Sequence, residues 1–166
     1  MASDFEDRFL KAMGKVVVEF ERLEGMLDSG LWVLLNTGQR PGHIVVTSMS
    51  FRNKLDAFDA LARHRKEGSL DKELHENLVR HLSGLEERRN RVLHSVRGEV
   101  TLDDTRIRIN GSAKGSRGFS VAPEEYTDAD LSKMEGEISS AADELRDYVL
   151  SFEELVKGTN TVRSGE

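Results

Sequence analysis

A short segment near the middle of the chain combines the side chains that phosphodiester chemistry requires. Arg89, Asn90 and His94 stand within one stretch of six residues. A guanidinium can bind a phosphate through two parallel hydrogen bonds and stabilise the charge that develops in the transition state. An imidazole titrates near neutral pH, so it can take a proton from a ribose 2′-hydroxyl or give one to a leaving 5′-oxygen. These residues predict a metal-independent phosphodiester site, in which Asn90 orients the imidazole or contacts the phosphate.

The spacing limits how these three residues can act together. Asn90 and His94 are four residues apart, so they share a face of a continuing helix. Arg89 and His94 are five residues apart and point about 140° away from each other. Both reach one ligand only if the helix ends near His94, which the pattern after Ser95 favours, or if a second subunit supplies one of them. The alternative is a histidine that caps the last carbonyls of a helix among solvated arginines.

Charge is distributed unevenly along the chain. The formal net charge is −6, which argues against non-specific nucleic-acid binding by the whole surface. From Arg88 to Arg117, however, eight basic residues stand against three acidic ones, so this stretch carries +5 and the remainder carries −11. An acidic body with one basic region fits an anionic ligand held at one place, and Arg88, Arg91 and Arg97 are the expected RNA contacts. A solvated charged surface on a hairpin explains the same distribution.

Hydrophobic periodicity predicts four helices that would position this site. They are expected from about Asp4 to Asn36, from Ile44 to Lys66, from Ser69 to near Ser95, and from Thr127 onward. Residues 37–42, with two glycines and a proline, are the predicted connection between the first two helices. Ser69 is the expected cap of the third helix, and Thr127 followed by Asp130 has the form of a capping box.

The period changes to two residues between the third and fourth helices. Val100 and Leu102, then Ile107 and Ile109, alternate with polar residues, which predicts a β-hairpin. A Gly/Ser-rich loop over residues 110–118 and a short edge strand at 119–121 should follow. The chain is therefore expected to be an all-α protein. It should form a single helical-bundle domain over residues 1–157, with the hairpin and loop at about 97–122 before the last helix, and a flexible tail at 158–166.

Three charged residues interrupt the apolar stripes of the predicted helices. Glu24, Lys54 and Arg89 each lie three or four residues from apolar neighbours on the inward face. A charge in that position is costly unless it is paired or borders a polar cleft. One interpretation is a partly buried salt-bridge network, in which Glu24 pairs with Arg89 or Lys54. The other is that the same groups border the site and Glu24 orients Arg89. The two are compatible.

The segment Arg89-Asn90-Arg91-Val92-Leu93-His94-Ser95 resembles the signature of the HEPN superfamily, the higher eukaryotes and prokaryotes nucleotide-binding domains. That signature is an arginine, a following polar residue that is commonly asparagine, and a histidine a few residues later. The resemblance extends more loosely to Leu23-Glu24 and to residues 50–56. It implies a four-to-five-helix bundle that dimerises with the two motifs facing each other, which would pool residues of both subunits. The hairpin and Gly-rich loop after the motif depart from the compact members.

The same resemblance implies a function. Many members are metal-independent endoribonucleases of toxin–antitoxin or phage-defence systems, and others are non-catalytic RNA-binding or scaffold domains. Carried over to this chain, Arg89, Asn90 and His94 are the expected catalytic residues, with Glu24 and Lys54 in support. The expected partners are RNA, a second copy of the chain, and an antitoxin or another protein. The second hypothesis is a non-catalytic helical-bundle adaptor that binds a protein and uses its inward charges to hold its fold.

Other kinds of site receive no support from the composition. The chain has no cysteine, which excludes disulfides, thiolate metal sites and cysteine nucleophiles. His75 and His81 are six residues apart and are interpreted as ordinary polar residues, so no metal and no cofactor are expected. The apolar runs are too short to span a bilayer and no secretory leader opens the sequence, which predicts a cytoplasmic protein without a membrane partner.

Overall fold

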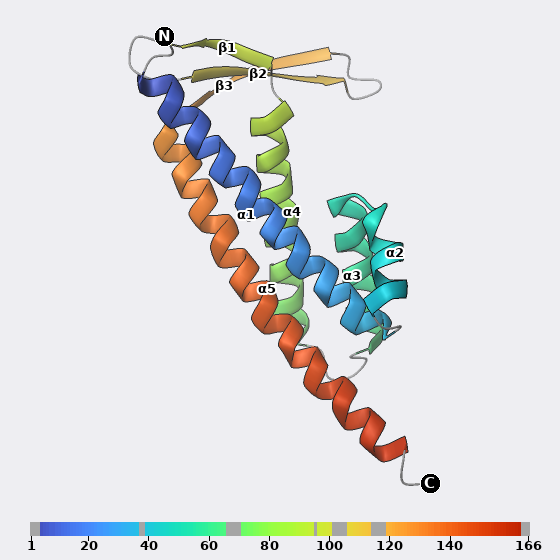
Figure 1. Cartoon of the computed structure of the whole chain (residues 1–166). Coiled ribbons are helices and arrows are strands. Elements are labelled where there is room, and N and C mark those ends of the chain that lie inside the picture. The colour runs from blue at the N-terminus through green and yellow to red at the C-terminus, as the bar shows by residue number, and fades with distance from the viewer. Residues whose placement is uncertain are drawn as a thin grey trace.

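Five helices and a three-stranded sheet make up the structure, a computed structural model that describes residues 4–36, 39–65, 71–94, 96–100, 106–113 and 119–163. In chain order the elements are α1 (Asp4–Leu35), α2 (Gln39–Thr47), α3 (Phe51–Arg65), α4 (Lys72–His94), β1 (Val96–Val100), β2 (Arg106–Ala113), β3 (Phe119–Tyr126) and α5 (Asp128–Arg163). The predicted all-α bundle with a β insertion before the last helix is confirmed (Figure 1). Across these ranges, no helix combines the length and apolar character needed to cross a membrane.

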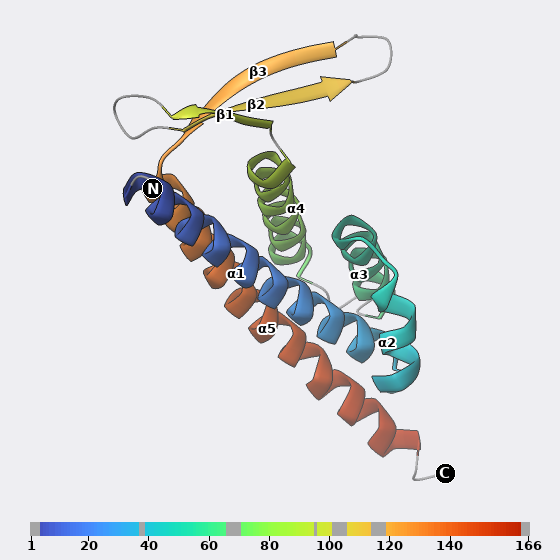
Figure 2. The same cartoon turned by 45° about the horizontal axis from the view of Figure 1, so that its top comes forward.

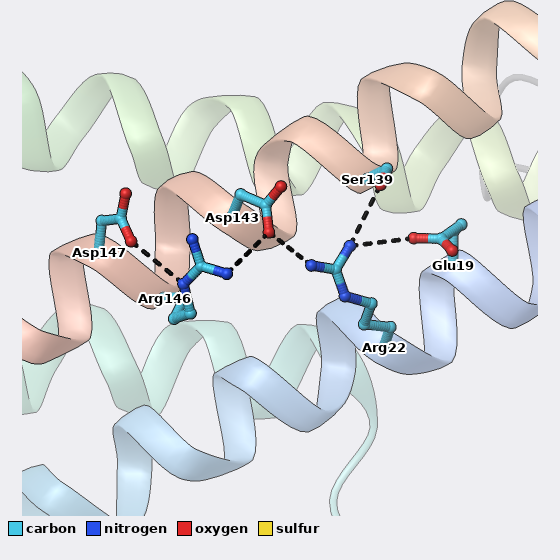
Figure 3. A network of polar contacts seen from close by, with 6 residues as sticks. All are labelled: Glu19, Arg22, Ser139, Asp143, Arg146 and Asp147. Atoms are coloured by element: carbon cyan, nitrogen blue, oxygen red, sulfur yellow. Dashed lines mark hydrogen bonds and ion pairs between the residues drawn. The ribbon is translucent and has the colours of Figure 1, made fainter.

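The long helices α1 and α5 lie side by side and run in the same direction (Figures 1 and 2). Arg8 of α1 binds Asp128 near the start of both helices, and Arg22 bridges to Ser139 and Asp143 further along. Arg146 continues this surface network along α5 (Figure 3). These groups are largely exposed, so such pairs contribute little to stability, and the buried apolar faces must hold the two helices together.

The core forms where α1, α3, α4 and α5 meet. Its largest fully buried side chains are Phe9, Phe20, Phe58, Leu23, Leu27, Leu31, Leu34, Leu55, Leu78, Leu82, Leu85 and Leu131. Gly30 marks a close approach of three helices, because a Cβ atom built there would lie 2.8 Å from both Phe58 Cε2 and Val149 Cγ2. The missing side chain therefore allows α1 to pack closely against α3 and α5.

The helix predicted from Ile44 to Lys66 is wrong in one respect, because the chain forms two helices there. Met49 N–H donates to Val46 O at the end of α2, and Ser50 then caps α3 by accepting from Asn53 N–H at 3.3 Å. The apolar period continues across this break, so periodicity alone does not reveal it. The predicted connection at 37–42 also differs, since α2 begins at Gln39 with Pro41 in its first turn, where a proline costs no helical hydrogen bond.

The beginnings of α4 and α5 show how local capping sets helix limits. Asp71 caps α4 by accepting from Leu74 N–H at 3.0 Å, while the predicted cap Ser69 lies outside the described residues. The capping box at α5 is confirmed, because Thr127 N–H donates to Asp130 Oδ2 at 2.9 Å and Asp130 N–H donates to Thr127 Oγ1 at 3.1 Å. Helix α5 continues to Arg163, beyond the predicted end of the domain at residue 157.

The predicted hairpin is part of an antiparallel sheet with strand order β1-β2-β3. Register pairs Arg97 with Arg108 between β1 and β2, and eight consecutive residues pair between β2 and β3. Strand β2 extends into the predicted loop at 110–118, and β3 is longer than the expected edge strand, because the two strands satisfy each other's backbone groups along this length. The sheet lies across the end of the bundle where α4 ends and α5 begins (Figures 1 and 2).

Candidate functional site

Arg89 lies half-buried on α4, with its guanidinium against α1. The guanidinium carbon is 4.9 Å from the centre of the Phe20 ring, a distance at which the ring face attracts a cation. Arg89 Nη1 donates to Asn90 Oδ1 at 3.0 Å, whereas Arg89 Nε is buried without a hydrogen-bond partner. No carboxylate in the described part of the chain forms an ion pair with Arg89. Its position is therefore fixed by an aromatic ring and an amide, which leaves guanidinium donors for a ligand.

His94 is the last residue of α4, and its side chain is exposed. The predicted helix end near Ser95 is confirmed, since β1 starts at Val96. Within the described ranges no polar side chain holds the imidazole, and Asn90 binds Arg89 instead of His94. The structure therefore brings Arg89 and Asn90 together, whereas the His94 side chain is exposed at the end of α4.

Lys54 is the centre of a buried ion-pair cluster between α1 and α3. Its side chain is 6% exposed, and its Nζ lies 2.6 Å from Glu24 Oε1 and 2.8 Å from Asp28 Oδ1. Burial by itself lowers the pKa of Lys54, but the hydrogen bonds and charges of Asp28 and Glu24 outweigh burial and raise this pKa. Of the two partners predicted for Glu24, the structure selects Lys54. Asp28 was missed, although its place four residues after Glu24 puts both on one face of a helix.

A second cluster joins α3 to α4 one turn before the motif. Arg52 Nε lies 3.1 Å from Glu86 Oε2, and Arg52 Nη1 donates to Ser83 Oγ at 2.7 Å. Glu86 is buried and stands three residues before Arg89, on the same side of α4. The cluster thus fixes the rotation of α4 at the point where the motif begins.

Two of the three basic residues predicted to contact RNA border a cleft at the same end of the bundle. The cleft has a volume of about 480 Å³ and is lined by Arg88 and Arg91 of α4, Glu125 and Tyr126 of β3, and Asp130, Lys133 and Met134 of α5. Arg88 also forms an ion pair with Glu137 of α5. Arg97, the third predicted contact, lies in β1, and its side chain is outside the described part of the structure.

His75 is not an ordinary surface residue, which corrects its interpretation from sequence. Its ring is fully buried, with Nε2 2.7 Å from Asp59 Oδ1 and Nδ1 2.8 Å from the Tyr148 hydroxyl. An ionised carboxylate can only accept, so Nε2 carries a proton and donates to Asp59. The apolar stripe of α4 passes through His75, whereas its neighbour Leu74 is exposed. Three helices are therefore joined by one chain of polar side chains.

This chain of polar groups predicts how stability changes at alkaline pH. Burial, with a contribution from Asp71, raises the pKa of Tyr148 from 10.0 to about 12. Because the folded-state pKa is raised, the stabilisation is fully present below pH 10 and is lost as the pH rises toward 12. Tyr148→Phe should lower stability at pH 8 by about 1 kcal/mol through the lost hydrogen bond to His75.

The measurement is urea unfolding of both proteins at intervals from pH 8 to pH 11.5. The difference between wild type and Tyr148→Phe should shrink as the pH rises above 10, because the tyrosine of the unfolded wild-type chain then ionises while the folded protein keeps the hydroxyl protonated. A difference that is independent of pH would show that the Tyr148 hydroxyl titrates in the folded protein as it does in the unfolded chain.

Fold and site together define a helical bundle whose fourth helix ends in Arg-Asn-x-x-x-His beneath a small antiparallel sheet. Comparison with protein-family models, with curated proteins and with solved structures finds no match for this chain.

Proposed function

We propose that the protein is a HEPN-like RNA-binding protein and a metal-independent endoribonuclease that works as a homodimer. The observation that carries the proposal is the end of α4. There, Arg89 contacts the Phe20 ring and Asn90, and this leaves guanidinium N–H groups to donate to a ligand. The exposed His94 follows where the helix ends. Arg88 and Arg91, in the same last turns of α4, line a cleft together with residues of β3 and α5. A fixed guanidinium, a solvent-accessible imidazole and a cleft with cations are the groups that cleavage of an RNA strand uses.

The separation of Arg89 and His94 within one chain favours a composite site formed by two copies. Arg89 would bind the phosphate and stabilise charge on the phosphorane, while Asn90 keeps the guanidinium in place. The imidazole of one protomer takes the proton of the ribose 2′-hydroxyl as the 2′-oxygen attacks phosphorus. The protonated imidazole of the other gives a proton to the 5′-oxygen as the P–O5′ bond breaks. The products are a 2′,3′-cyclic phosphate and a 5′-hydroxyl, and no metal is required.

Such an activity suits a toxin–antitoxin or phage-defence role. An enzyme that cuts RNA in its own cell must be restrained until it is needed, so an antitoxin or another protein is the expected further partner. Binding over the end of α4 would be sufficient, because that end carries both the exposed imidazole and the cleft.

The test is incubation of purified protein, in the presence of EDTA, with a mixed pool of labelled structured and unstructured RNAs. Light scattering on the same sample should give the mass of a dimer. Cleavage products should end in 2′,3′-cyclic phosphate, which acid treatment and phosphatase distinguish from a linear phosphate. Intact RNA after incubation with a folded dimer, across the whole pool, would contradict the proposed nuclease.

A second candidate function, a non-catalytic adaptor that binds a protein, is favoured by two other observations. Lys54 and Arg52 form ion pairs with carboxylates inside the bundle, which is a structural role. On α2, Ile44 and Val45 are 75% and 52% exposed, and adjacent exposed apolar side chains are common where a partner binds. Two results together would support this candidate. RNA would stay intact, and a protein partner would bind to wild type but not to Ile44→Asp.

A further inference from the structure

Glu86 of α4 is a buried carboxylate with one arginine beside it and a second one helical turn away. Its side chain is 12% exposed, and its Oε2 lies 3.1 Å from Arg52 Nε of α3. Arg89 stands three residues further along α4, and side chains three residues apart are neighbours on the surface of a helix. A buried carboxylate is costly unless a cation compensates its charge. Which of the two arginines supplies that cation therefore affects the state of Arg89.

Arg52 supplies the cation from the first turn of α3. Besides its contact with Glu86, its Nη1 donates to Ser83 Oγ at 2.7 Å and its Nη2 donates to Glu87 Oε1 at 3.4 Å. Ser83, Glu86 and Glu87 lie within a single turn of α4, so one guanidinium contacts three side chains of that turn. The rigid fork of donors that an arginine carries suits such a set of contacts. Arg52 thus keeps the Glu86 carboxylate paired with α3.

Two buried atoms show that Glu86 and Arg89 could also pair with each other. The contact between Arg52 and Glu86 is an ion pair by distance, but Glu86 Oε2 is buried without a hydrogen-bond partner among the described residues, and so is Arg89 Nε. A carboxylate oxygen that lacks a donor and a guanidinium N–H that lacks an acceptor form a strong, charge-assisted hydrogen bond when they meet. Glu86 is therefore an internal competitor of any anion that binds Arg89.

We propose that Arg52 is a positioning residue for the candidate site: it holds Glu86 and so keeps the Arg89 guanidinium available for a phosphate. This inference rests on the proposed function for the identity of the anion, but the pairing of Glu86 can be measured without RNA. The neighbour of Arg52, Phe51, acts on the same guanidinium through a ring. Its centre lies 4.8 Å from that of Phe20, over which Arg89 lies. The first turn of α3 thus acts on Arg89 through a charge and through a ring.

The first test observes the Nε–H group of Arg89 by proton–nitrogen correlation NMR, with its signal identified by its absence from Arg89→Lys. In Arg52→Met the Glu86 carboxylate should accept from this group, which moves the proton signal downfield. Adding Glu86→Gln should return the signal toward its wild-type position, because the charged acceptor is then gone. Arg52→Gln removes the same charge but keeps a donor for Ser83, so it should give the same shift in a variant that retains part of the contact. An Arg89 signal that does not change in either variant would overturn the inference.

The second test measures affinity for a single-stranded 2′-O-methyl oligonucleotide, which a 2′-hydroxyl mechanism cannot cleave. Arg52→Met should bind it about 10-fold more weakly, and the slope of log affinity against log salt should fall by about one, since one phosphate contact is lost. The double variant Arg52→Met with Glu86→Gln should bind within about twofold of wild type, because no carboxylate then competes for Arg89.

Arg63→Met is the matched control for both tests. The Arg63 side chain is 42% exposed, against 41% for Arg52, and it also joins α3 to a carboxylate of α4, at 3.5 Å from Glu76 Oε1. This contact lies at the other end of α3, far along α4 from the motif. The control should therefore leave both the Arg89 signal and the affinity for the oligonucleotide as they are in wild type.

The outcomes separate this inference from the proposed function. A shifted Arg89 signal in Arg52→Met that Glu86→Gln reverses supports the positioning role, even if wild type binds no RNA, a result that would contradict the proposed function alone. Weaker RNA binding by Arg52→Met that Glu86→Gln does not restore would show that Arg52 itself contacts RNA, and would overturn the inference. Circular dichroism and urea unfolding of each variant confirm that the bundle is folded.

Discussion

His94→Ala should lower the rate of RNA cleavage by a factor of about 10²–10⁴, the usual contribution of a positioned general acid or base. The replaced imidazole would be the group that moves protons at both the 2′- and the 5′-oxygen, so its loss affects bond making and bond breaking together. Because the side chain is exposed and has no polar partner among the described residues, its removal should change the free energy of unfolding by less than about 0.5 kcal/mol. The rate is measured on a cleavable RNA in EDTA, beside a urea unfolding curve.

His64→Ala is the control for this experiment. His64 is also exposed and also lies in the last turn of its helix, but that helix is α3, whereas the motif lies in α4. Its replacement should leave both the cleavage rate and the stability unchanged. If His94→Ala retained wild-type activity, the proton transfers would have to be assigned to another group and the proposed chemistry would be wrong. A loss of activity in both variants would point to a general effect of the histidines on RNA binding.

Lys54→Met should destabilise the folded protein by about 3 kcal/mol. The substitution keeps the length of the side chain and removes the one cation that, in the described part of the chain, forms ion pairs with Glu24 and Asp28 of α1. Glu24 and Asp28 would remain with their side chains 24% and 20% exposed, too little for water to replace the ammonium group fully. Partial exposure places the expected loss at the lower end of the range for a broken buried ion pair. Chemical denaturation at pH 7 measures it directly.

A matched exposed lysine and a compensated variant make this prediction specific. Lys15→Met removes the same charge from an exposed position of α1 and should change stability by less than about 0.5 kcal/mol. Adding Glu24→Gln and Asp28→Asn to Lys54→Met should restore part of the lost stability, because the stranded charges are then gone. Equal stability of Lys54→Met and wild type would mean that water hydrates the two carboxylates in the folded state. The cluster would then contribute nothing to the free energy of unfolding.

The helix limits show which local signals the sequence carries. The start of α5 was predictable, because Thr127 and Asp130 satisfy each other's backbone groups within four residues. The end of α2 was not predictable, since the apolar period runs on through the break between α2 and the Ser50 cap of α3. A signal formed by neighbouring residues can be identified in the sequence, whereas a break inside a continuous apolar pattern depends on how the two helices pack.

The candidate site divides in the same way. That Arg89 faces inward and that α4 stops near His94 followed from spacing alone, and both are found in the structure. At one position apolar character does not give the phase of the α4 stripe, because Leu74 and His75 are adjacent and differ by only about 100° around the helix. Leucine is the more apolar of the two, yet His75 is the buried one, since Asp59 and Tyr148 from two other helices satisfy its ring.

By itself, the sequence determined the helical periods, the position of the β insertion and the set of charges that must be neutralised. Those features depend on residues a few positions apart, whose geometry is set by the backbone. Only the tertiary structure decided that Lys54 pairs with both Glu24 and Asp28, that Arg89 contacts Phe20, and that α4, β3 and α5 line one cleft. Each of these contacts joins segments far apart in the chain. Their formation depends on the rotation and spacing of whole helices, which the packing of the shared core sets.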